Sequence, residues 1–178
     1  MPSPHVVLYI AASLDGFIAR RDGDVSWLDP FNSPEEDHGY HEFMETVDVS
    51  IMGSRTYEQT LTFETATEED VRKLYVVTKR QLPKRNSNVE FYAGDVSELV
   101  NGLKATLEKN IWLMGGSQLI TSFMNRGLVD QVMLFVMPVI LTEGVPLFDN
   151  IHEEISLRLR GSQSYATGLV KLHYDIAR

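Results

Sequence analysis

The sequence predicts an α/β protein with a mostly parallel central sheet and an antiparallel edge made by its C-terminal strands. Strand-like and helix-like segments alternate through about residue 130, which is typical of a parallel sheet covered by helices. Beyond that point only strand-like segments remain. With 178 residues and an ordinary globular composition, residues 1–178 are expected to form a single domain.

The first strand is expected at 6–12, an apolar run with the continuous hydrophobicity of a strand buried on both faces. Further strands are expected at 47–52, 73–78, 89–92, 110–114, 129–141, 155–165 and 169–176. In the last of these, apolar and polar residues alternate, which is the pattern of a half-buried antiparallel strand.

Two helices open with a capping box, in which side chains at the helix start bond the free backbone N–H groups. These helices are expected at 33–46, with Ser33 and Glu36, and at 95–109, with Asp95 and Glu98. Shorter helices are expected at 53–61 and 117–126, and the acidic segment 64–72 is expected to be a loop with a helical turn.

The charge and residue usage exclude several classes of protein. Sixteen Lys and Arg against 25 Asp and Glu give a net charge of −9, so a general nucleic-acid-binding surface is not expected. The absence of cysteine excludes disulfides, thiolate metal sites and a cysteine nucleophile. No metal site is expected, because His38 and His41 lack a third and fourth ligand. No apolar run reaches the ~20 residues of a membrane span, and the N-terminus does not look like a signal peptide, so we expect a cytoplasmic protein without a membrane partner.

Three strand ends lead into turns that suit an anionic ligand, and ligands of open α/β sheets bind outside the carboxyl ends of the strands. The turns contain Gly53, Arg55 and Thr56; Gly115, Gly116 and Ser117; and Thr78, Lys79 and Arg80. Glycine allows close backbone approach, a helix start offers free N–H groups, and basic side chains add charge. Each turn taken alone is as well explained by an ordinary strand–helix turn or a solvated basic loop. Their coincidence favours a ligand with several phosphates, such as a dinucleotide, although the Rossmann and Walker A patterns are absent.

Trp27 lies in a Gly- and Asp-rich loop that follows the first strand. It either covers a bound planar ligand or packs on the rim of the core. The sequence does not favour one interpretation over the other.

The chain carries, in order, the segments SLDGFIA at 13–19, GDVSW at 23–27, MGSRTY at 52–57, VVTKR at 76–80, LMGGS at 113–117, and PVIL with PLF at 138–141 and 146–148. Together they resemble the dihydrofolate reductase-like superfamily, and most closely the branch of the reductase domain of bacterial riboflavin-biosynthesis bifunctional enzymes. The resemblance implies a sheet of about eight strands with helices on both faces and NADPH lying across the carboxyl ends of the strands.

The resemblance also implies roles for individual residues. Cofactor binding is implied for Ala11, Ala12, Ile18, Gly53, Arg55, Thr56, Thr78, Lys79, Arg80, Gly115, Gly116, Ser117 and Gln118. Among these, Thr78, Lys79 and Arg80 would surround the adenosine 2′-phosphate. Substrate binding is expected for Ser13, Asp15, Trp27, Tyr40 and Phe43. Asp15 either orients the substrate or caps a turn.

Two positions depart from the pattern of the family. Ser54 stands where the family often has Arg. In the register set by Trp27 and Phe43, the acidic residue of the dihydrofolate reductases falls on Gly39. We therefore do not expect folate reduction, and no proton donor can be assigned from the resemblance.

The expected function is that of an NADPH-dependent reductase, which transfers a hydride to a small pyrimidine- or pterin-like heterocycle or to a carbonyl compound. The alternative is a non-catalytic NADP(H)-binding or regulatory protein on the same fold. The apolar segment 129–141 and the C-terminal hairpin predict a homodimer, and the relatives associate through this part of the fold. A fully internal strand at 129–141 is the alternative to that prediction.

Overall fold

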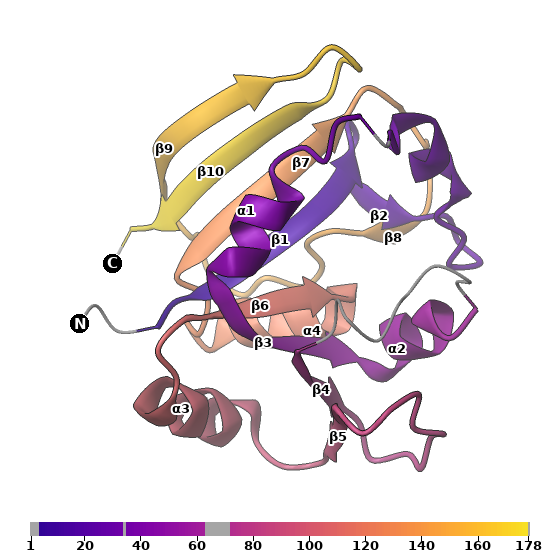
Figure 1. Ribbon diagram of the computed structural model, residues 1–178. Coiled ribbons are helices and arrows are strands. Elements are labelled where there is room, and N and C mark those ends of the chain that lie inside the picture. The colour runs from indigo at the N-terminus through magenta and orange to yellow at the C-terminus, as the bar shows by residue number, and fades with distance from the viewer. Residues whose placement is uncertain (1–3, 34, 63–71, 178) are drawn as a thin grey trace.

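The computed structural model describes residues 4–33, 35–62 and 72–177, and it has one eight-stranded sheet in the order β5-β4-β3-β6-β1-β7-β10-β9 (Figure 1). The strands are β1 (Val6–Ser13), β3 (Val47–Gly53), β4 (Lys73–Val77), β5 (Val89–Tyr92), β6 (Asn110–Gly115), β7 (Gln131–Met137), β9 (Leu157–Ser164) and β10 (Val170–Ile176). A separate two-stranded sheet pairs β2 (Phe17–Ala19) with β8 (Val145–Pro146). The helices are η1, a 3₁₀ helix (Ser26–Phe31), α1 (Tyr40–Glu45), α2 (Ser54–Thr60), α3 (Val96–Thr106) and α4 (Ser117–Asn125).

The strands from β5 to β7 in this order are parallel, and β10 and β9 continue the sheet in antiparallel pairing. This arrangement confirms the expected fold class. Because β1, β3, β4 and β6 run in the same direction, their carboxyl ends meet at one edge of the sheet, and the glycine-rich and basic turns come together there.

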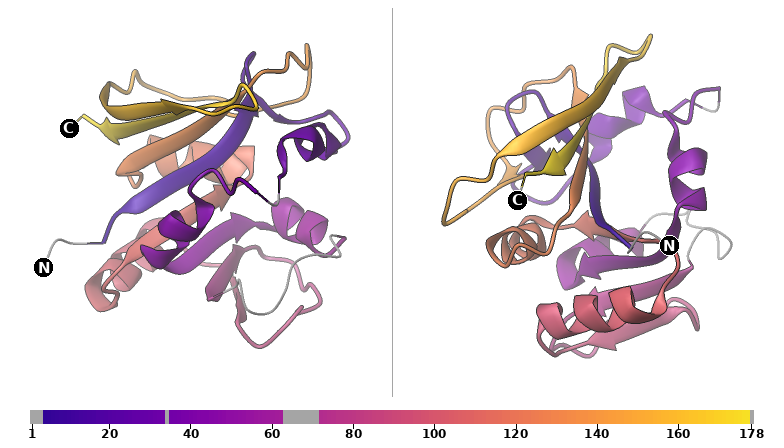
Figure 2. Two further views of the ribbon diagram at one scale, coloured as in Figure 1. Left: turned by 45° about the horizontal axis from the view of Figure 1, so that its top comes forward. Right: turned by 90° about the vertical axis from the view of Figure 1, so that its left-hand side faces the viewer.

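Helices cover both faces of the sheet (Figure 2). On one face, Leu8 of β1 belongs to the same buried cluster as Leu103 of α3 and Phe123 of α4. On the other face, Val7 packs with Phe43 of α1. Successive residues of a strand point to opposite faces, so the apolar run of β1 supplies both cores. This is why the run shows no alternation in the sequence.

The helix predicted at 33–46 begins later than expected, at Tyr40. His38 and Gly39 have φ angles of 54° and 81°, which lie in the left-handed region and cannot belong to a right-handed helix. The carboxylate of Asp37, rather than Ser33, accepts hydrogen bonds from the backbone N–H groups of Gly39 and His41 at the helix start. Ser33 instead forms a β-bridge with Glu36. The prediction of a Ser33 capping box is therefore wrong.

The second predicted cap is confirmed at its first residue. The side chain of Asp95 accepts hydrogen bonds from the backbone N–H groups of Ser97 and Glu98 at the start of α3. The loop predicted at 64–72 lies almost entirely outside the described residues.

The C-terminal strands form the antiparallel edge of the sheet. β7 is shorter than the predicted 129–141 and lies between β1 and β10, so it is an internal strand. In β10 every residue is half-buried, and in β9 every residue is exposed, since β9 is the edge of the sheet. β10 is therefore the half-buried antiparallel strand predicted at 169–176, although burial does not alternate along it.

The helices in the described ranges are too short or too polar to cross a membrane.

Candidate active site

The turn after β3 and the turn after β6 touch each other at the carboxyl edge of the sheet. A Cβ atom placed on Gly53 would lie 3.8 Å from the backbone nitrogen of Gly116 and 3.9 Å from the carbonyl oxygen of Gly115. A Cβ atom on Gly116 would lie 3.1 Å from the hydroxyl oxygen of Thr56, which is closer than most real Cβ contacts. Glycine at these positions keeps two stretches of backbone, with their N–H groups, accessible at one place.

Ser117 begins α4 directly after the Gly115–Gly116 peptide bond, which is cis. Its side chain is buried, and its hydroxyl oxygen has no hydrogen-bond partner among the described residues. Buried hydroxyl groups are normally paired, so an unpaired one beside a helix start indicates a place for a ligand atom. The start of the helix adds free N–H groups and a partial positive charge.

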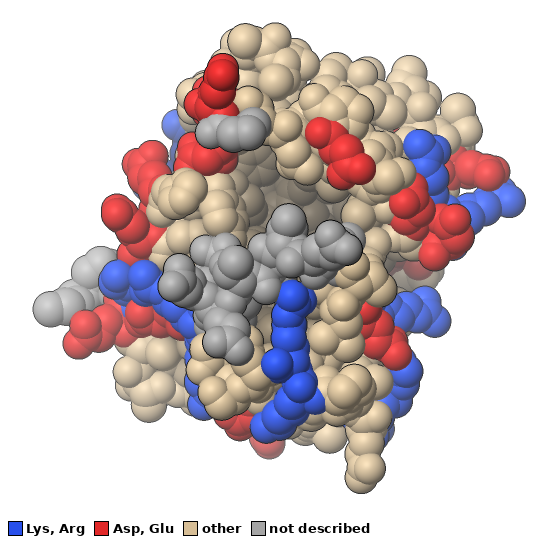
Figure 3. Space-filling view, turned by 45° about the vertical axis from the view of Figure 1, so that its right-hand side comes forward, with Lys and Arg blue, Asp and Glu red and all other residues tan. Residues whose placement is uncertain are grey.

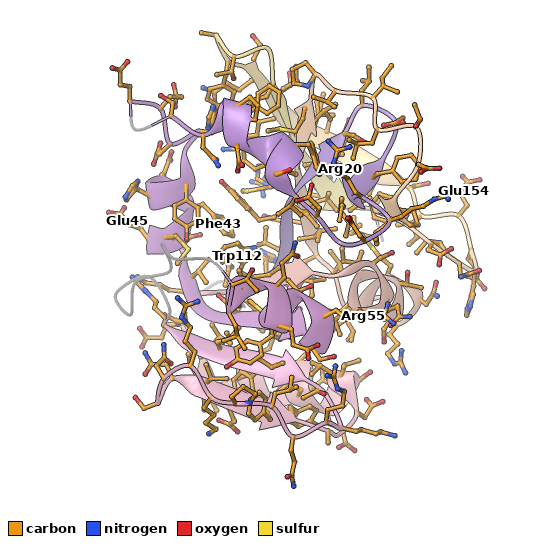
Figure 4. The ribbon with its side chains drawn as sticks, turned by 90° about the vertical axis from the view of Figure 1, so that its right-hand side faces the viewer. Arg20, Phe43, Glu45, Arg55, Trp112 and Glu154 are labelled. Carbon is orange, nitrogen blue, oxygen red and sulfur yellow. The ribbon has the colours of Figure 1, made fainter. Side chains whose placement is uncertain are left out.

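Arg55 and Gln118 are the exposed members of these two turns. Figure 4 shows Arg55 at the start of α2. Farther along α2, the side-chain amide of Gln59 donates to the carbonyl oxygen of Gly23. This contact connects α2 to the loop that carries Trp27.

The basic turn after β4 is held by an ion pair. Arg80 donates from both terminal nitrogens to the carboxylate of Glu58, with distances of 2.8 and 2.6 Å, and its backbone N–H donates to the hydroxyl of Thr78. The Arg80 hydrogen bonds lower the pKa of Glu58, and the charge of Arg55 contributes a smaller share. Lys79 is exposed. The turn therefore presents two cations and one carboxylate at the end of α2.

The middle of the sheet is open on one face. In β6 the residues Ile111 and Leu113 are buried, whereas Trp112 and Met114, which point to the other face, are half-exposed. Tyr9 and Ala11 of β1 lie on the same face as Trp112 and are also half-exposed. We call Tyr9, Ala11, Trp112 and Met114 the central face. The space-filling view shows the molecule hollowed on this side (Figure 3).

Aromatic rings border the central face. Tyr9 stacks on Phe43 with ring centroids 4.1 Å apart and planes at 17°. Trp112 meets the edge of Phe43 at 5.6 Å, and Phe135 of β7 lies 4.7 Å from Tyr9. Figure 4 shows Phe43 and Trp112 reaching toward each other from α1 and β6. Burial, and after it the neighbouring Tyr40, raise the pKa of the Tyr9 hydroxyl, which therefore stays protonated.

Trp27 packs against the rim of the core rather than over an open surface. It is 5% exposed and shares a cluster with Phe135, Met137 and Leu141. Its indole nitrogen is buried without a hydrogen-bond partner among the described residues. Of the two interpretations open at the outset, the geometry matches packing on the rim.

Asp15 joins two loops at the end of β1. Its carboxylate accepts hydrogen bonds from the hydroxyl of Ser13 at 2.6 Å and from the backbone N–H groups of Leu141 and Thr142 at 3.0 and 2.7 Å. These bonds, that of Ser13 first, lower the pKa of Asp15. Leu141 packs against Trp27 in the same cluster. Ser13 and Asp15 therefore fix the loop at Leu141 and Thr142, which lies behind Trp27. Asp15 thus has the turn-capping role.

The residues expected beside the nicotinamide do not share one face. Ala11 belongs to the central face, whereas Ala12 is buried in the cluster on the opposite face, where Ile18 also packs. Tyr40 and Phe43 both lie on α1, Tyr40 half-exposed and Phe43 4% exposed. Of the expected substrate residues, Tyr40 and Phe43 therefore lie nearest the aromatic rings of the central face.

The comparison with known proteins identifies the family. A family model described as the RibD C-terminal domain matches residues 4–171. The chain belongs to this family. The expected resemblance to the dihydrofolate reductase-like superfamily, in its riboflavin-biosynthesis branch, is confirmed.

Known proteins resemble the chain to different degrees. YwjB of Bacillus subtilis (strain 168), an uncharacterized protein, is 38% identical over 168 residues, which are 94% of this chain and 95% of that protein. A crystal structure of a candidate riboflavin biosynthesis protein from Shewanella sp. PV-4 superposes with a TM-score of 0.87 and 25% identity, covering 98% of this chain and 99% of that one.

A Thermotoga maritima protein, described as a diaminohydroxyphosphoribosylaminopyrimidine deaminase/5-amino-6-(5-phosphoribosylamino)uracil reductase, matches with a TM-score of 0.72 and 17% identity. The match covers 98% of this chain and 57% of that one, and at this identity it shows the fold alone.

The structure adds site residues that the sequence did not reveal. Tyr9, Trp112, Phe135 and Lys171 all lie inside strands, whereas the sequence directed attention to the turns after strands. A partial signal existed: Tyr9 and Trp112 are aromatic residues in strands that are otherwise aliphatic. Nothing in the sequence indicates that Phe135 lies beside Tyr9 or that Lys171 lies over Phe135, because strand pairing brings them together.

Proposed function

We propose that this member of the RibD C-terminal family is an NADPH-dependent reductase that transfers a hydride to a small planar heterocycle, pyrimidine- or pterin-like, or to a carbonyl compound. One observation carries the cofactor assignment: the turns at Gly53 and Gly116 meet, and the hydroxyl of Ser117, which has no hydrogen-bond partner among the described residues, lies beside them. Bare backbone, a helix start and an unpaired hydroxyl are the groups that a pyrophosphate needs.

The residues at the edge of the sheet are proposed to bind different parts of NADPH. Gly53, Arg55, Thr56, Gly115, Gly116, Ser117 and Gln118 would hold the pyrophosphate region, and Thr78, Lys79 and Arg80 the 2′-phosphate. Ala11 would border the nicotinamide, whereas Ala12 and Ile18 pack in the core on the opposite face. When bound, NADPH supplies the hydride, and the chain supplies orientation and electrostatics. Ser13 and Asp15 keep the wall of the site in place through the Leu141 contact.

The substrate class is supported by the aromatic rings around the central face. Flat rings suit stacking on Tyr9, Tyr40, Phe43 or Trp112, and Trp27 supports the adjoining wall. The Thermotoga maritima relative is described as acting on a substituted uracil, which is also a flat heterocycle. A small-molecule substrate of this shape is the proposal for the present chain.

The test begins with binding. NADPH is titrated into the protein, and quenching of Trp27 and Trp112 fluorescence gives the dissociation constant. Gly116→Ala places a methyl group 3.1 Å from the Thr56 hydroxyl, so NADPH should bind about tenfold or more weakly, which corresponds to about 1.4 kcal/mol. Gly102→Ala is the matched control, because a Cβ atom there meets nothing within 4 Å. Equal NADPH affinity in wild type and Gly116→Ala would contradict the assignment of this turn.

The second step separates a reductase from a binding protein. Oxidation of NADPH is followed by absorbance while uracil-, pterin- and carbonyl-containing compounds are added in turn. Oxidation that depends on one class of compound supports the reductase. Tight NADPH binding with no oxidation for any class would instead favour the non-catalytic NADP(H)-binding protein.

A further inference from the structure

Lys171 lies on the central-face side of the sheet, although it is 160 residues from Ala11 in the chain. Ala11 pairs with Phe135, and Phe135 pairs with Lys171, across the adjacent strands β1, β7 and β10. Directly paired residues point to the same face of a sheet. The ammonium nitrogen of Lys171 stands 5.8 Å from the centre of the Phe135 ring, and that ring contacts Tyr9.

Lys171 also occupies the position that a side chain at Gly39 would enter. A Cβ atom on Gly39 would lie 3.4 Å from the Lys171 ammonium nitrogen. Gly39 caps α1, and Phe43, four residues later, stacks on Tyr9. The place where the register of the dihydrofolate reductases puts a carboxylate on the helix is therefore taken here by a cation from the sheet.

The ammonium group of Lys171 is available to a ligand. No ion pair between Lys171 and a carboxylate is found among the described residues, and the ammonium nitrogen lies over the Phe135 ring. The side chain is half-buried, so it is partly removed from water. A partly desolvated ammonium group beside aromatic rings favours an oxygen acceptor, and it disfavours a cation or a row of N–H donors.

We propose that Lys171 determines the specificity of this site, and that the ring bound on the central face presents a carbonyl or carboxylate oxygen to its ammonium group. The inference rests on the proposed function and narrows it to planar heterocycles with an oxygen-bearing edge. A carboxylate at Gly39 would select the reverse, a ring with an amidine-like or protonated edge, because opposite charges attract and hydrogen bonds between charged partners are strong.

Two probes of similar size distinguish these cases: uracil-6-carboxylate, which is planar and anionic, and 2,4-diaminopyrimidine, which offers donors. Calorimetry measures the affinity of each probe for wild-type protein, with and without NADPH. Wild type should prefer uracil-6-carboxylate. Lys171→Met keeps the apolar stem over Phe135 and should weaken binding of this probe about tenfold or more, as expected for a lost hydrogen bond to a charged group. Lys171→Arg should retain most of the affinity.

Lys73→Met is the matched control. Lys73 also lies over an aromatic ring, that of Tyr75 at 4.7 Å, but on β4 at the far side of the sheet. Its removal should leave the affinity for both probes unchanged. NADPH affinity should be the same in all these variants, because Lys171 lies away from the glycine turns.

A second pair of variants tests the same idea from the helix side. Gly39→Asp and Gly39→Asn impose similar backbone strain at φ 81°, and Asp and Asn tolerate this region better than most residues. Only the aspartate carries the charge to form an ion pair with the ammonium group of Lys171. Gly39→Asp should therefore lose affinity for uracil-6-carboxylate relative to Gly39→Asn. Thermal unfolding shows which variants are folded. If Lys171→Met does not fold, the comparison of Gly39→Asp with Gly39→Asn decides the role of Lys171.

The outcomes separate the two proposals. If Lys171→Met and Gly39→Asp bind uracil-6-carboxylate like their controls, or if wild type prefers 2,4-diaminopyrimidine, the role of Lys171 is refuted even when NADPH binds well. If NADPH does not bind wild type at all, the proposed function fails, while the probe affinities measured without cofactor still decide the role of Lys171.

Discussion

The guanidinium group of Arg80 donates hydrogen bonds to both carboxylate oxygens of Glu58, with nitrogen–oxygen distances of 2.8 and 2.6 Å. The pair is largely exposed, so it adds little to stability. The ion pair instead affects how a phosphate could bind to Arg80. A phosphate that binds to Arg80 must share the guanidinium group with Glu58 or displace it, and Glu58 also repels the phosphate.

The cofactor preference should therefore depend on both members of this pair. We expect NADPH to bind at least about tenfold more tightly than NADH, because the 2′-phosphate forms charge-assisted bonds with the turn at Thr78 and Lys79. Arg80→Ala should reduce that preference, whereas Glu58→Gln should increase it by removing the competing charge. The dissociation constants come from tryptophan quenching.

Arg158→Ala serves as the control for this prediction, since Arg158 is also exposed and paired with a carboxylate, that of Asp175, at the opposite edge of the sheet. It should not alter the preference. Equal affinities of the wild type for NADPH and NADH would refute the phosphate site.

Dihydrofolate should be reduced slowly or not at all. Gly39 has no side chain to deliver a proton, and Asp37 cannot replace it, because hydrogen bonds from the backbone of His41, from its ring and from Gly39 lower the pKa of Asp37 to about 2. Near neutral pH this carboxylate is ionised and already serves as the cap of α1. A steady-state assay with NADPH and dihydrofolate measures the rate.

Turnover of dihydrofolate at about 1 s⁻¹ or more, the ordinary range for enzymes, would contradict this expectation. If that turnover then disappeared in Asp37→Asn or Glu36→Gln, the acidic residue would lie outside the register used here. Glu36 accepts a hydrogen bond from the backbone N–H of His38, so the structure gives it a local role as well.

We still predict a homodimer, although the surface differs from the one first expected. β7 is internal, which removes the argument from 129–141. β9 at the sheet edge exposes Leu157 by 44% and Leu159 by 55%, on the face that also carries the half-buried Tyr174. Such exposed apolar side chains on an edge strand suit a second copy of the chain.

Sedimentation at micromolar concentration tests the assembly, and a species near twice the chain mass of 20.2 kDa is expected. Leu159→Glu should shift the protein toward monomer. Ile140→Glu, at a position 64% exposed outside β9, should leave the assembly intact. Monomer alone in the wild type would refute the dimer.

The contribution of Asp15 to stability should depend on pH in a defined direction. Its folded-state pKa lies below the ordinary value of 3.8, so its contribution is fully present above that value and is lost as the pH falls through the folded pKa. Asp15→Asn should lower the melting temperature at about pH 7, and the difference from wild type should shrink as the pH falls below 3.8 and through the folded-state pKa. Thermal unfolding across this range measures both effects.

Asp22→Asn is the comparison variant, as Asp22 is an exposed acid whose carboxylate accepts one hydrogen bond within the described residues, from the backbone N–H of Asp24. It should change the melting temperature less than Asp15→Asn does. A difference between Asp15→Asn and wild type that stays constant across the pH range would show that the charge of Asp15 does not matter.

The sequence by itself determined the strands and the turns of this protein. Apolar runs such as 6–12 are buried strands, Asp95 caps α3, and glycines stand where β3 and β6 lead into helices. Each of these features depends on residues close together in the chain, so local pattern and turn chemistry suffice to predict them. The prediction of a helix start at residue 33 was wrong, because a capping pattern does not reveal the left-handed conformation of His38 and Gly39.

Only the tertiary structure decided what lies on the central face. Tyr9, Trp112, Phe135 and Lys171 come from four strands, and they become neighbours through lateral pairing of β6, β1, β7 and β10. The choice between covering a ligand and packing on the rim at Trp27 depended in the same way on contacts with Phe135 and Leu141. The apolar pattern of a strand indicates how deeply the strand is buried. The identity of its neighbours follows from how the whole sheet packs, because pairing joins residues far apart in the chain.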